Sequence, residues 1–319
     1  MAEILKISSL EKTYHLPRFL QKPVDVCALR GVSFELAEGE TLAIVGESGC
    51  GKSTLAKVIV GLESASSGSA AYLGKGLETL SPQERSEKIQ LVFQDPYSSL
   101  NPRKRVMDLI AEPLVIKNTL SPSEIKNRVS ELMLEVGLRP EFATRYPHMF
   151  SGGQRQRIGI ARALILKPKV IVCDEPVSAL DVSVQAQVLN LLRDLQQKEK
   201  LTYIFISHDL SVVRFIAHRV AVMYLGKIVE ISDKKSLFEK PRHPYSLLLL
   251  ESTPKFGQGV SQNEFKTQEM PSPTRIPSGC SFHTRCPFAT ETCKAQVPEL
   301  RSFLGGQVAC HHAEKVAGV

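Results

Sequence analysis

Short apolar runs, separated by glycines and polar turns, predict a chain in which strands and helices alternate. Continuous apolar runs at 42–45, 170–173 and 203–206 have the length of strands buried on both faces of a parallel sheet. A further strand is expected at 89–93. Apolar residues three and four positions apart over 123–136 predict an amphipathic helix. These patterns together indicate an α/β fold.

Two other stretches follow the alternating pattern of antiparallel strands. Residues 5–8 and 32–36 alternate between apolar and polar side chains, as half-buried strands do. The runs 220–224 and 227–231 flank a two-residue Leu-Gly turn, which predicts a tight hairpin. The interval from about 96 to 166 is expected to be mainly helical. An antiparallel sheet and a helical region should therefore accompany the parallel sheet.

The run GESGCGKST at 46–54 fits the phosphate-binding pattern G-x-x-x-x-G-K-[ST]. It follows the apolar strand and opens an apolar helix, which is the context that the pattern requires. Glycines let backbone N–H groups turn toward phosphate oxygens. Lys52 would meet the β- and γ-phosphates, and the Ser53 hydroxyl would bind Mg²⁺. The loop residues expected to contact a nucleoside triphosphate are Gly46, Ser48, Gly49, Cys50, Gly51, Lys52, Ser53 and Thr54.

Two carboxylates end the apolar strand at 170–173. Asp174 is suited to hold Mg²⁺ through water, beside Ser53. Glu175, the next residue, would approach the attacking water as general base. A pair of turn residues before Pro176 is the alternative interpretation. The phosphate loop upstream favours the catalytic one.

Polar residues also follow two other predicted strands. His208 comes directly after the strand at 203–206, at the sheet edge where ligands of such folds bind, and is expected to reach the γ-phosphate. Gln94 ends the strand at 89–93 and could orient water or Mg²⁺. Either residue taken alone would be an ordinary turn residue.

A second turn of small residues, Ser151-Gly152-Gly153-Gln154, opens another predicted helix. Free N–H groups at a helix N-terminus favour anions, so the turn is a second phosphate-grade site. Because the first loop already holds the triphosphate, we expect a head-to-tail dimer in which each turn covers the partner's nucleotide. A plain N-cap by Ser151 is the simpler alternative.

Composition limits the classes of partner. The net charge is +7, but Lys and Arg are scattered rather than gathered in a basic tail, so nucleic acid is not an expected partner. The longest apolar runs fall far short of the roughly 20 residues that cross a bilayer. The N-terminus lacks a basic segment followed by an apolar one, so no signal peptide is expected. We therefore expect a cytosolic chain whose seven cysteines are thiols or metal ligands.

Four of those cysteines, Cys280, Cys286, Cys293 and Cys310, fall within the last 40 residues. A short tail with little apolar content gains from a metal staple. Gaps of five, six and sixteen residues favour a [4Fe–4S] cluster over zinc, which usually takes two close cysteine pairs. Histidines nearby in the sequence could also serve as zinc ligands, so a zinc site is the second interpretation. Four unrelated thiols are the third.

These motifs, in this order, resemble the ATP-binding cassette of ABC transporters. Residues 46–54 resemble the Walker A motif, 151–154 the signature motif, and 170–175 the Walker B motif with its catalytic glutamate. Further matches are Gln94 to the Q-loop, Asp181 to the D-loop, His208 to the switch histidine and Tyr14 to the aromatic that stacks on adenine. The resemblance implies a RecA-like core sheet, an antiparallel β subdomain and a helical subdomain at about 96–166. It also implies a cassette at 1–240 and a small metal-binding C-terminal extension at 241–319.

Residues 98–105, 146–151 and 242–245 resemble the peptide-importer branch of that family, and so does the cysteine tail. The resemblance implies ATP and Mg²⁺ as ligands and uptake of dipeptides or short oligopeptides. Implied partners are a second ATPase subunit, with a paralogue favoured over a second copy, two transmembrane permeases and, indirectly, a peptide-binding protein. The chain would lie at the cytoplasmic face of the inner membrane as a peripheral protein.

A soluble iron–sulfur ABC ATPase acting on ribosomes or nucleic acid is the alternative. A protein of that kind would be expected to carry two cassettes in one chain, whereas this chain has one.

Overall fold

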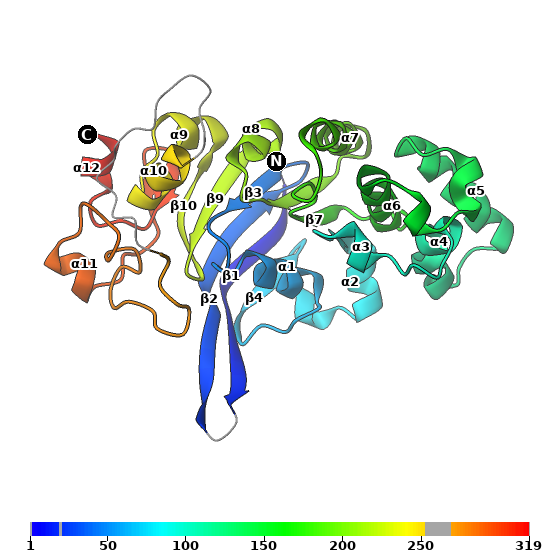
Figure 1. Cartoon of the computed structure of the whole chain (residues 1–319). Helices are drawn as coiled ribbons and strands as arrows, with labels where there is room; N and C mark the ends of the chain where they lie inside the picture. Colours follow the sequence, from blue (N-terminus) through cyan, green and yellow to red (C-terminus); the bar gives the residue numbers. More distant parts are fainter. Residues whose placement is uncertain (1, 19–20, 253–268, 319) are drawn as a thin grey trace. The chain divides into compact units, whose positions relative to one another are not determined.

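The structure, a computed structural model, describes residues 2–18, 21–252 and 269–318 (Figure 1). The chain forms two compact units. One consists mainly of residues 77–206, and the other of residues 3–36, 41–76 and 207–319. The candidate site residues are divided between these units, so each unit is described by itself.

Three parallel strands form the sheet of the 77–206 unit, in the order β8-β7-β6. They are β6 (Ile89–Val92), β7 (Val170–Asp174) and β8 (Thr202–Ile206). Every residue of β8 is buried, as are the first four of β7, which explains why these strands are continuous apolar runs. The register aligns Val92 of β6 with Cys173 of β7, so the chain leaves both strands at one edge of the sheet.

Helices make up the rest of this unit, and α4, α5 and α6 pack against one another (green in Figure 1). The helices are α2 (Pro82–Lys88), α3 (Pro96–Ser99), α4 (Val106–Lys117), α5 (Pro122–Glu135), α6 (Gly152–Leu164) and α7 (Val182–Glu199). The amphipathic helix expected at 123–136 is α5, which buries Val129, Leu132 and Met133. Ser121 caps it, and the Glu124 side chain bonds back to the Ser121 N–H, forming a capping box.

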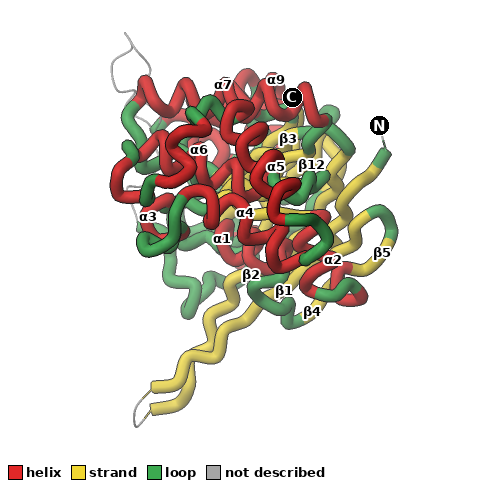
Figure 2. The backbone as a smooth tube through the Cα atoms, turned by 90° about the vertical axis from the view of Figure 1, so that its right-hand side faces the viewer, coloured by secondary structure: helices red, strands yellow, loops and turns green. Residues whose placement is uncertain are grey.

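An antiparallel sheet in the order β2-β1-β4-β5 opens the second unit. Its strands are β1 (Glu3–Arg18), β2 (Gln21–Ala37), β4 (Ser67–Tyr72) and β5 (Lys75–Gly76). The first two strands run side by side as a long ribbon in both views (Figures 1 and 2). The predicted strands at 5–8 and 32–36 are confirmed, although both are parts of much longer ones.

A second set of strands in this unit carries the phosphate loop. Strand β3 (Thr41–Val45) lies parallel to β9 (Arg219–Tyr224), and β10 (Lys227–Asp233) returns antiparallel to β9. The predicted hairpin turn is confirmed. Leu225 and Gly226 both have positive φ, 43° and 79°, as a primed two-residue turn requires.

The remaining elements of this unit surround those strands. Strand β12 (Gly306–Val308) pairs with β10, and β11 (Arg301–Phe303) pairs with β12. Its helices are α1 (Lys52–Val60), α8 (Leu210–Ile216), α9 (Lys234–Glu239), α10 (Pro244–Glu251), α11 (Glu291–Ala295) and α12 (Ala313–Ala317). The chain beyond residue 290 thus adds its own hairpin to the edge of the sheet.

The buried carboxylate of Glu230 anchors the segment that follows α9. It accepts hydrogen bonds from the backbone N–H groups of Arg242 (3.1 Å) and His243 (2.9 Å). The Tyr245 ring then packs against Tyr224 and Phe282, with ring centroids 4.6 and 5.4 Å away. Residues 243–245 therefore pack against β9 and the segment around Phe282.

A composition rich in Ser, Pro, Gln and Gly predicts a loose linker at about 255–279, and residues 253–268 lie outside the described residues. Within the described part of that interval, 269–279, the chain has neither helix nor strand. Among the helices of residues 2–18, 21–252 and 269–318, none combines the length and the apolar character needed to cross a membrane.

His243 is buried and neutral. Burial lowers the pKa of its imidazole to about 3, and the hydrogen bond to the Ala309 backbone acts the other way. Nδ1 accepts the N–H of Tyr245 and so caps α10. In the unfolded chain the imidazole has its ordinary pKa of 6.5, so the unfolded state binds the proton more readily. The stabilisation is therefore present above pH 6.5 and is lost as the pH falls toward 3.

We predict that His243→Asn reduces the acid sensitivity of folding. Asparagine keeps a capping acceptor but does not titrate. Between about pH 7.5 and about pH 5.5 the wild-type chain should lose about 1.4 kcal/mol of unfolding free energy that the variant retains. Urea unfolding at the two pH values measures this difference. His15→Asn, which changes an exposed histidine, is the control, and equal losses in wild type and His243→Asn would contradict the prediction.

Candidate functional site

The phosphate loop runs so close to neighbouring backbone that glycine is required at two positions. Gly46 has φ 155°, and a Cβ there would lie 2.2 Å from the carbonyl oxygen of Met223. Gly51 has φ 109°, and its Cβ would lie 2.3 Å from the carbonyl oxygen of Ala28. In addition, the N–H of Gly226 donates to the Cys50 carbonyl (2.9 Å). The loop is thereby held between β2 and the β9–β10 turn.

Lys52 occupies the centre of this loop. Its side chain is buried, and Nζ donates to the carbonyl oxygens of Gly46 (2.7 Å) and Glu47 (3.0 Å). These carbonyls hold the ammonium at the mouth of α1, where helix N–H groups also favour an anion. A phosphate can take over those contacts when it binds. Of the other loop residues, Ser48, Gly49 and Ser53 are exposed, Thr54 is half-buried and Cys50 is buried.

Gln94 and Glu175 meet at the edge of the sheet in the 77–206 unit. Each lies two residues past the aligned pair Val92 and Cys173, and the Gln94 Nε2 donates to the Glu175 Oε2 (3.0 Å). Glu175 has a φ of 47°, a left-handed conformation that is costly for a residue with a Cβ. Its N–H donates to the Ile206 carbonyl (3.0 Å), which holds the residue there. Strain that is held in this way is typical of functional positions.

Ser151 caps α6 and is exposed. Its hydroxyl accepts the N–H of Gln154 (3.3 Å), and the Gln154 side chain accepts the N–H of Ser151 (3.0 Å). The simpler interpretation of this motif, a helix N-cap, is therefore correct as a description of the fold. Gly153 is buried, and a Cβ there would lie 2.3 Å from the Val184 side chain, so the position has room only for glycine. Ser151 thus exposes the start of a helix, where backbone N–H groups favour an anion.

His208 is exposed in the second unit and lines a cavity of about 420 Å³. Gly46 of the phosphate loop lines the same cavity. Ser207 precedes the histidine and is fixed by its own N–H, which donates to the Ile44 carbonyl (3.2 Å). The structure thus brings His208 and the start of the phosphate loop together, as the γ-phosphate role requires.

Three other predicted residues lie where the sequence indicates. Asp174 ends β7, and Asp181 is exposed at the N-terminus of α7. Tyr14 is half-buried on β1, with the Lys12 ammonium 4.9 Å from its ring centroid. These positions leave the magnesium, D-loop and adenine-stacking roles as predictions.

The four tail cysteines are gathered in one region. Cys280 donates its backbone N–H to the Cys293 carbonyl (2.8 Å). Burial raises the pKa of Cys286 to about 12, and the thiols of Cys310, Cys280 and Cys293 add to the rise. Within the described ranges, however, no three His, Cys, Asp or Glu side chains are grouped so that they could hold a metal ion. The expected metal-binding extension is therefore not formed as a ready site.

Sequence patterns did not indicate two contacts to the phosphate loop. The Glu47 N–H donates to the Tyr245 hydroxyl oxygen (2.8 Å), and the Glu47 carboxylate accepts two hydrogen bonds from Arg285 (2.9 Å each). Both partners come from the region after α9, 198 and 238 residues away in sequence. The only local signal was the apolar surroundings of Tyr245 in the run 244–250.

Comparison with known families gives two matches. Residues 29–178 match the family described as ABC transporter, and residues 229–293 match the family described as the C-terminal region of oligopeptide/dipeptide transporters. The first match contains the phosphate loop, Gln94, the signature turn and Glu175. The second contains Glu230, Tyr245, Arg285 and three of the tail cysteines.

Curated relatives match over nearly the whole chain. The di/tripeptide transport ATP-binding protein DppF of Pseudomonas aeruginosa is 51% identical, with both chains fully covered. The dipeptide transport ATP-binding protein DppF of Escherichia coli is 49% identical, covering 96% of this chain and 93% of the relative. The expected likeness to dipeptide transporter ATP-binding proteins of the F type is confirmed. Because the relatives are transport proteins, the ribosome alternative has no support.

A solved structure matches the greater part of the chain. It is a dimeric ATP-binding cassette in a post-hydrolysis state with ADP and phosphate, 30% identical, with a TM-score of 0.65. The match covers 72% of this chain and 99% of that one. Matched on family, sequence and fold, the chain belongs to the ABC transporter ATPases, in the branch that carries the oligopeptide/dipeptide transporter C-terminal region.

Proposed function

We propose that this chain is the ATP-hydrolysing motor subunit of an importer of dipeptides or short oligopeptides. The observation that carries the proposal is the match of residues 229–293 to the oligopeptide/dipeptide transporter region, next to a cassette whose ATP motifs are all present. ATP binding and hydrolysis would close and open two cassettes, and the motion would pass to membrane subunits. The division into a cassette at 1–240, with a helical subdomain near 96–166, and an extension at 241–319 is part of the proposal.

The polar side chains predicted to bind the metal offer oxygen ligands, which Mg²⁺ prefers as a hard cation. The Ser53 hydroxyl, the Asp174 carboxylate through water and the Gln94 amide oxygen would hold the ion, which neutralises phosphate charge when bound. Lys52 would bind the β- and γ-phosphates and His208 the γ-phosphate. Glu175 would take the proton of the attacking water as general base. The Gln94–Glu175 hydrogen bond and the held backbone of Glu175 support that role.

We expect Glu175→Gln to bind ATP and to hydrolyse it at least roughly 10²-fold more slowly, because an amide cannot accept the proton. Phosphate release by the chain assembled with its partner ATPase, and nucleotide binding by fluorescence, measure the two effects. Glu131→Gln, which changes an exposed carboxylate on α5, is the control and should hydrolyse ATP at the wild-type rate. Near-normal hydrolysis by Glu175→Gln would rule out the assignment.

A second cassette completes the site in this proposal. The turn of Ser151, Gly152, Gly153 and Gln154, in which Ser151 is exposed, would cover the partner's nucleotide, with Asp181 beside it. The solved relative named above is a dimer, which supports this arrangement. We favour a paralogous ATPase over a second copy, with two transmembrane permeases and a peptide-binding protein completing the importer. The chain would then be a peripheral protein on the cytoplasmic face of the inner membrane.

Affinity purification of the tagged chain from solubilised membranes tests these partners. We expect two membrane-spanning subunits and a second, different ATPase to be recovered with it. A second copy of this chain in place of the paralogue would overturn that preference. Ribosomal proteins or nucleic acid in place of permeases would overturn the importer itself. The tag alone, expressed in the same cells, is the control.

We also propose that the four tail thiols hold a [4Fe–4S] cluster, with zinc as the second choice. Four cysteines in electrostatic reach of one another, on a segment with a small core, fit a thiolate-bound group in number and kind. Burial raises the pKa of Cys310 to about 11, with the Cys280 and Cys293 thiols contributing. Binding of a cationic group would stabilise all four as thiolates and so tie the segment together. The role is structural, because ATP hydrolysis needs no redox centre.

Anaerobically purified protein should be brown, absorb broadly near ~400 nm and contain about four iron atoms per chain. Cys286→Ser should lose the colour and the iron while still binding ATP, since the cassette motifs are untouched. Cys27→Ser, on β2 and outside the tail, is the control and should keep both. Zinc without iron would replace the cluster by a zinc site. A wild-type chain that holds neither metal, together with a Cys286→Ser variant of unchanged stability, would reject any metal.

A further inference from the structure

Glu47 of the phosphate loop and Arg285 of the cysteine-bearing segment form a two-bond ion pair. Arg285 Nη1 donates to Oε2 and Nη2 to Oε1, each at 2.9 Å. A guanidinium facing a carboxylate in this parallel arrangement is the strongest geometry that an ion pair adopts in proteins. The two residues are 238 positions apart in sequence. Arg285 lies one residue before Cys286, so the tail touches the ATP loop directly.

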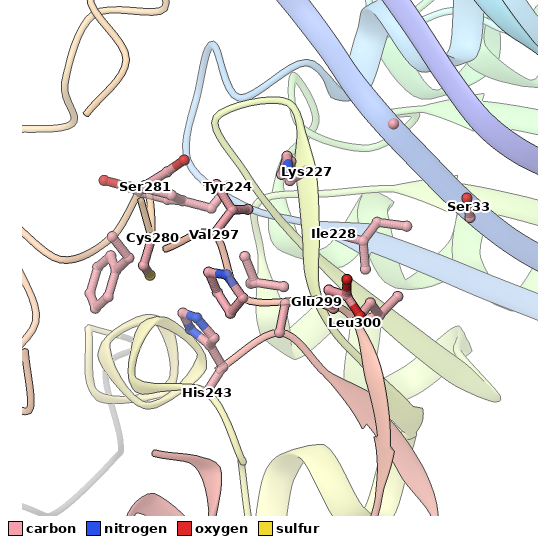
Figure 3. A pocket seen from close by; sticks show the side chains of 15 residues that line it. Ser33, Tyr224, Lys227, Ile228, His243, Cys280, Ser281, Val297, Glu299 and Leu300 are labelled. Atoms are coloured by element: carbon pink, nitrogen blue, oxygen red, sulfur yellow. The ribbon is translucent and has the colours of Figure 1, made fainter. Parts of the chain in front are cut away.

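This pair is partly shielded from water. The side chains of Arg285 and Glu47 are 9% and 29% exposed. Phe282 and Tyr224 flank the guanidinium, with ring centroids 5.8 and 6.0 Å from Cζ. Reduced exposure to solvent strengthens the attraction relative to that of a surface ion pair. The two rings restrict the positions that the Arg285 side chain can adopt. Phe282 and Tyr224, together with Cys280 and His243, line a pocket of about 390 Å³ (Figure 3).

Glu47 is the point at which several contacts of the loop meet. Its N–H donates to the Tyr245 hydroxyl, and its carbonyl accepts the Lys52 ammonium (3.0 Å). Its carboxylate faces Arg285. The C-terminal segment therefore holds the residue whose carbonyl holds the phosphate-binding lysine. A shift of Glu47 would move a contact that positions Lys52.

Charge gives the pair a second consequence. Glu47 is an anion in a loop that must accept a triphosphate, and like charges close together repel. The Arg285 guanidinium neutralises that carboxylate. Without the arginine, the loop would carry an unpaired negative charge beside the phosphates. Lost affinity for ATP is then expected even if the fold persists.

We propose that Arg285 is a positioning residue of the ATP site, which fixes and neutralises Glu47 so that the C-terminal segment sets the affinity of the phosphate loop for ATP. The proposal deepens the function proposed above and rests on ATP binding by this chain. It assigns to the segment a role in nucleotide binding in addition to its packing role.

Four variants of the full chain test it: R285A, R285K, E47Q and the double variant R285A/E47Q. We expect R285A to weaken ATP binding about tenfold and to raise KM with little change in kcat, because the loss is in binding. R285K keeps the charge but not the two-bond geometry and should lie between R285A and wild type. The double variant should bind ATP within about twofold of E47Q alone, because no unpaired carboxylate remains.

R301A is the matched control. It removes an exposed pair with Glu314 (2.6 Å) in the same segment and should bind ATP as the wild type does. Titration with a fluorescent ATP analogue gives the dissociation constants, and the unfolding midpoint without nucleotide reports on the fold. Should R285A fail to fold, R285K carries the test.

Wild-type affinity in both R285A and R285K would overturn the proposal. A loss in R285A/E47Q equal to the sum of the free-energy losses of R285A and E47Q would also overturn it, because the arginine would then act independently of Glu47. If the wild-type chain itself did not bind ATP, the proposed function would fail, and that outcome is distinct from the other two.

Discussion

Close approach of backbone to the phosphate loop is the constraint on which the ATP site depends. The carbonyls of Met223 and Ala28 leave no room for a Cβ at Gly46 or Gly51. Held in this way, the loop turns two of its carbonyls toward Lys52 and presents the start of α1 to an anion. A side chain at either glycine would have to displace backbone on β2 or β9. The loop is thus shaped by strands that lie far from it in sequence.

A buried carboxylate organises the C-terminal side of the same unit. Glu230 on β10 is fully buried, and burial raises its pKa while hydrogen bonds from the backbone N–H groups of His243 and Arg242 oppose the rise. A buried carboxylate that accepts several hydrogen bonds favours one arrangement of the chain, because removing any donor leaves a costly unsatisfied group. This arrangement directs the chain into α10, where Tyr245 reaches the phosphate loop. The segment after α9 therefore contacts the phosphate loop directly.

The two units use different physical means to hold their site residues. In the 77–206 unit, the parallel register of β6 and β7 suffices to bring Gln94 and Glu175 to one edge, and a local bond completes the pair. In the other unit, side chains from distant segments converge on Glu47. The first kind of contact follows from secondary structure. The second depends on packing among Tyr224, Tyr245 and Phe282.

The amino-acid sequence by itself determined the elements and the chemistry that local patterns encode. The apolar runs at 170–173 and 203–206, the primed turn at Leu225-Gly226 and the phosphate loop all have signals within a few residues, because strands, turns and helix starts depend on near neighbours. The tertiary structure alone decided that Arg285 meets Glu47 and that the Tyr245 hydroxyl accepts the loop N–H. It also showed four thiols gathered without forming a ready metal site among the described residues. Contacts of this kind depend on how side chains far apart in sequence pack together, and no local spacing records that.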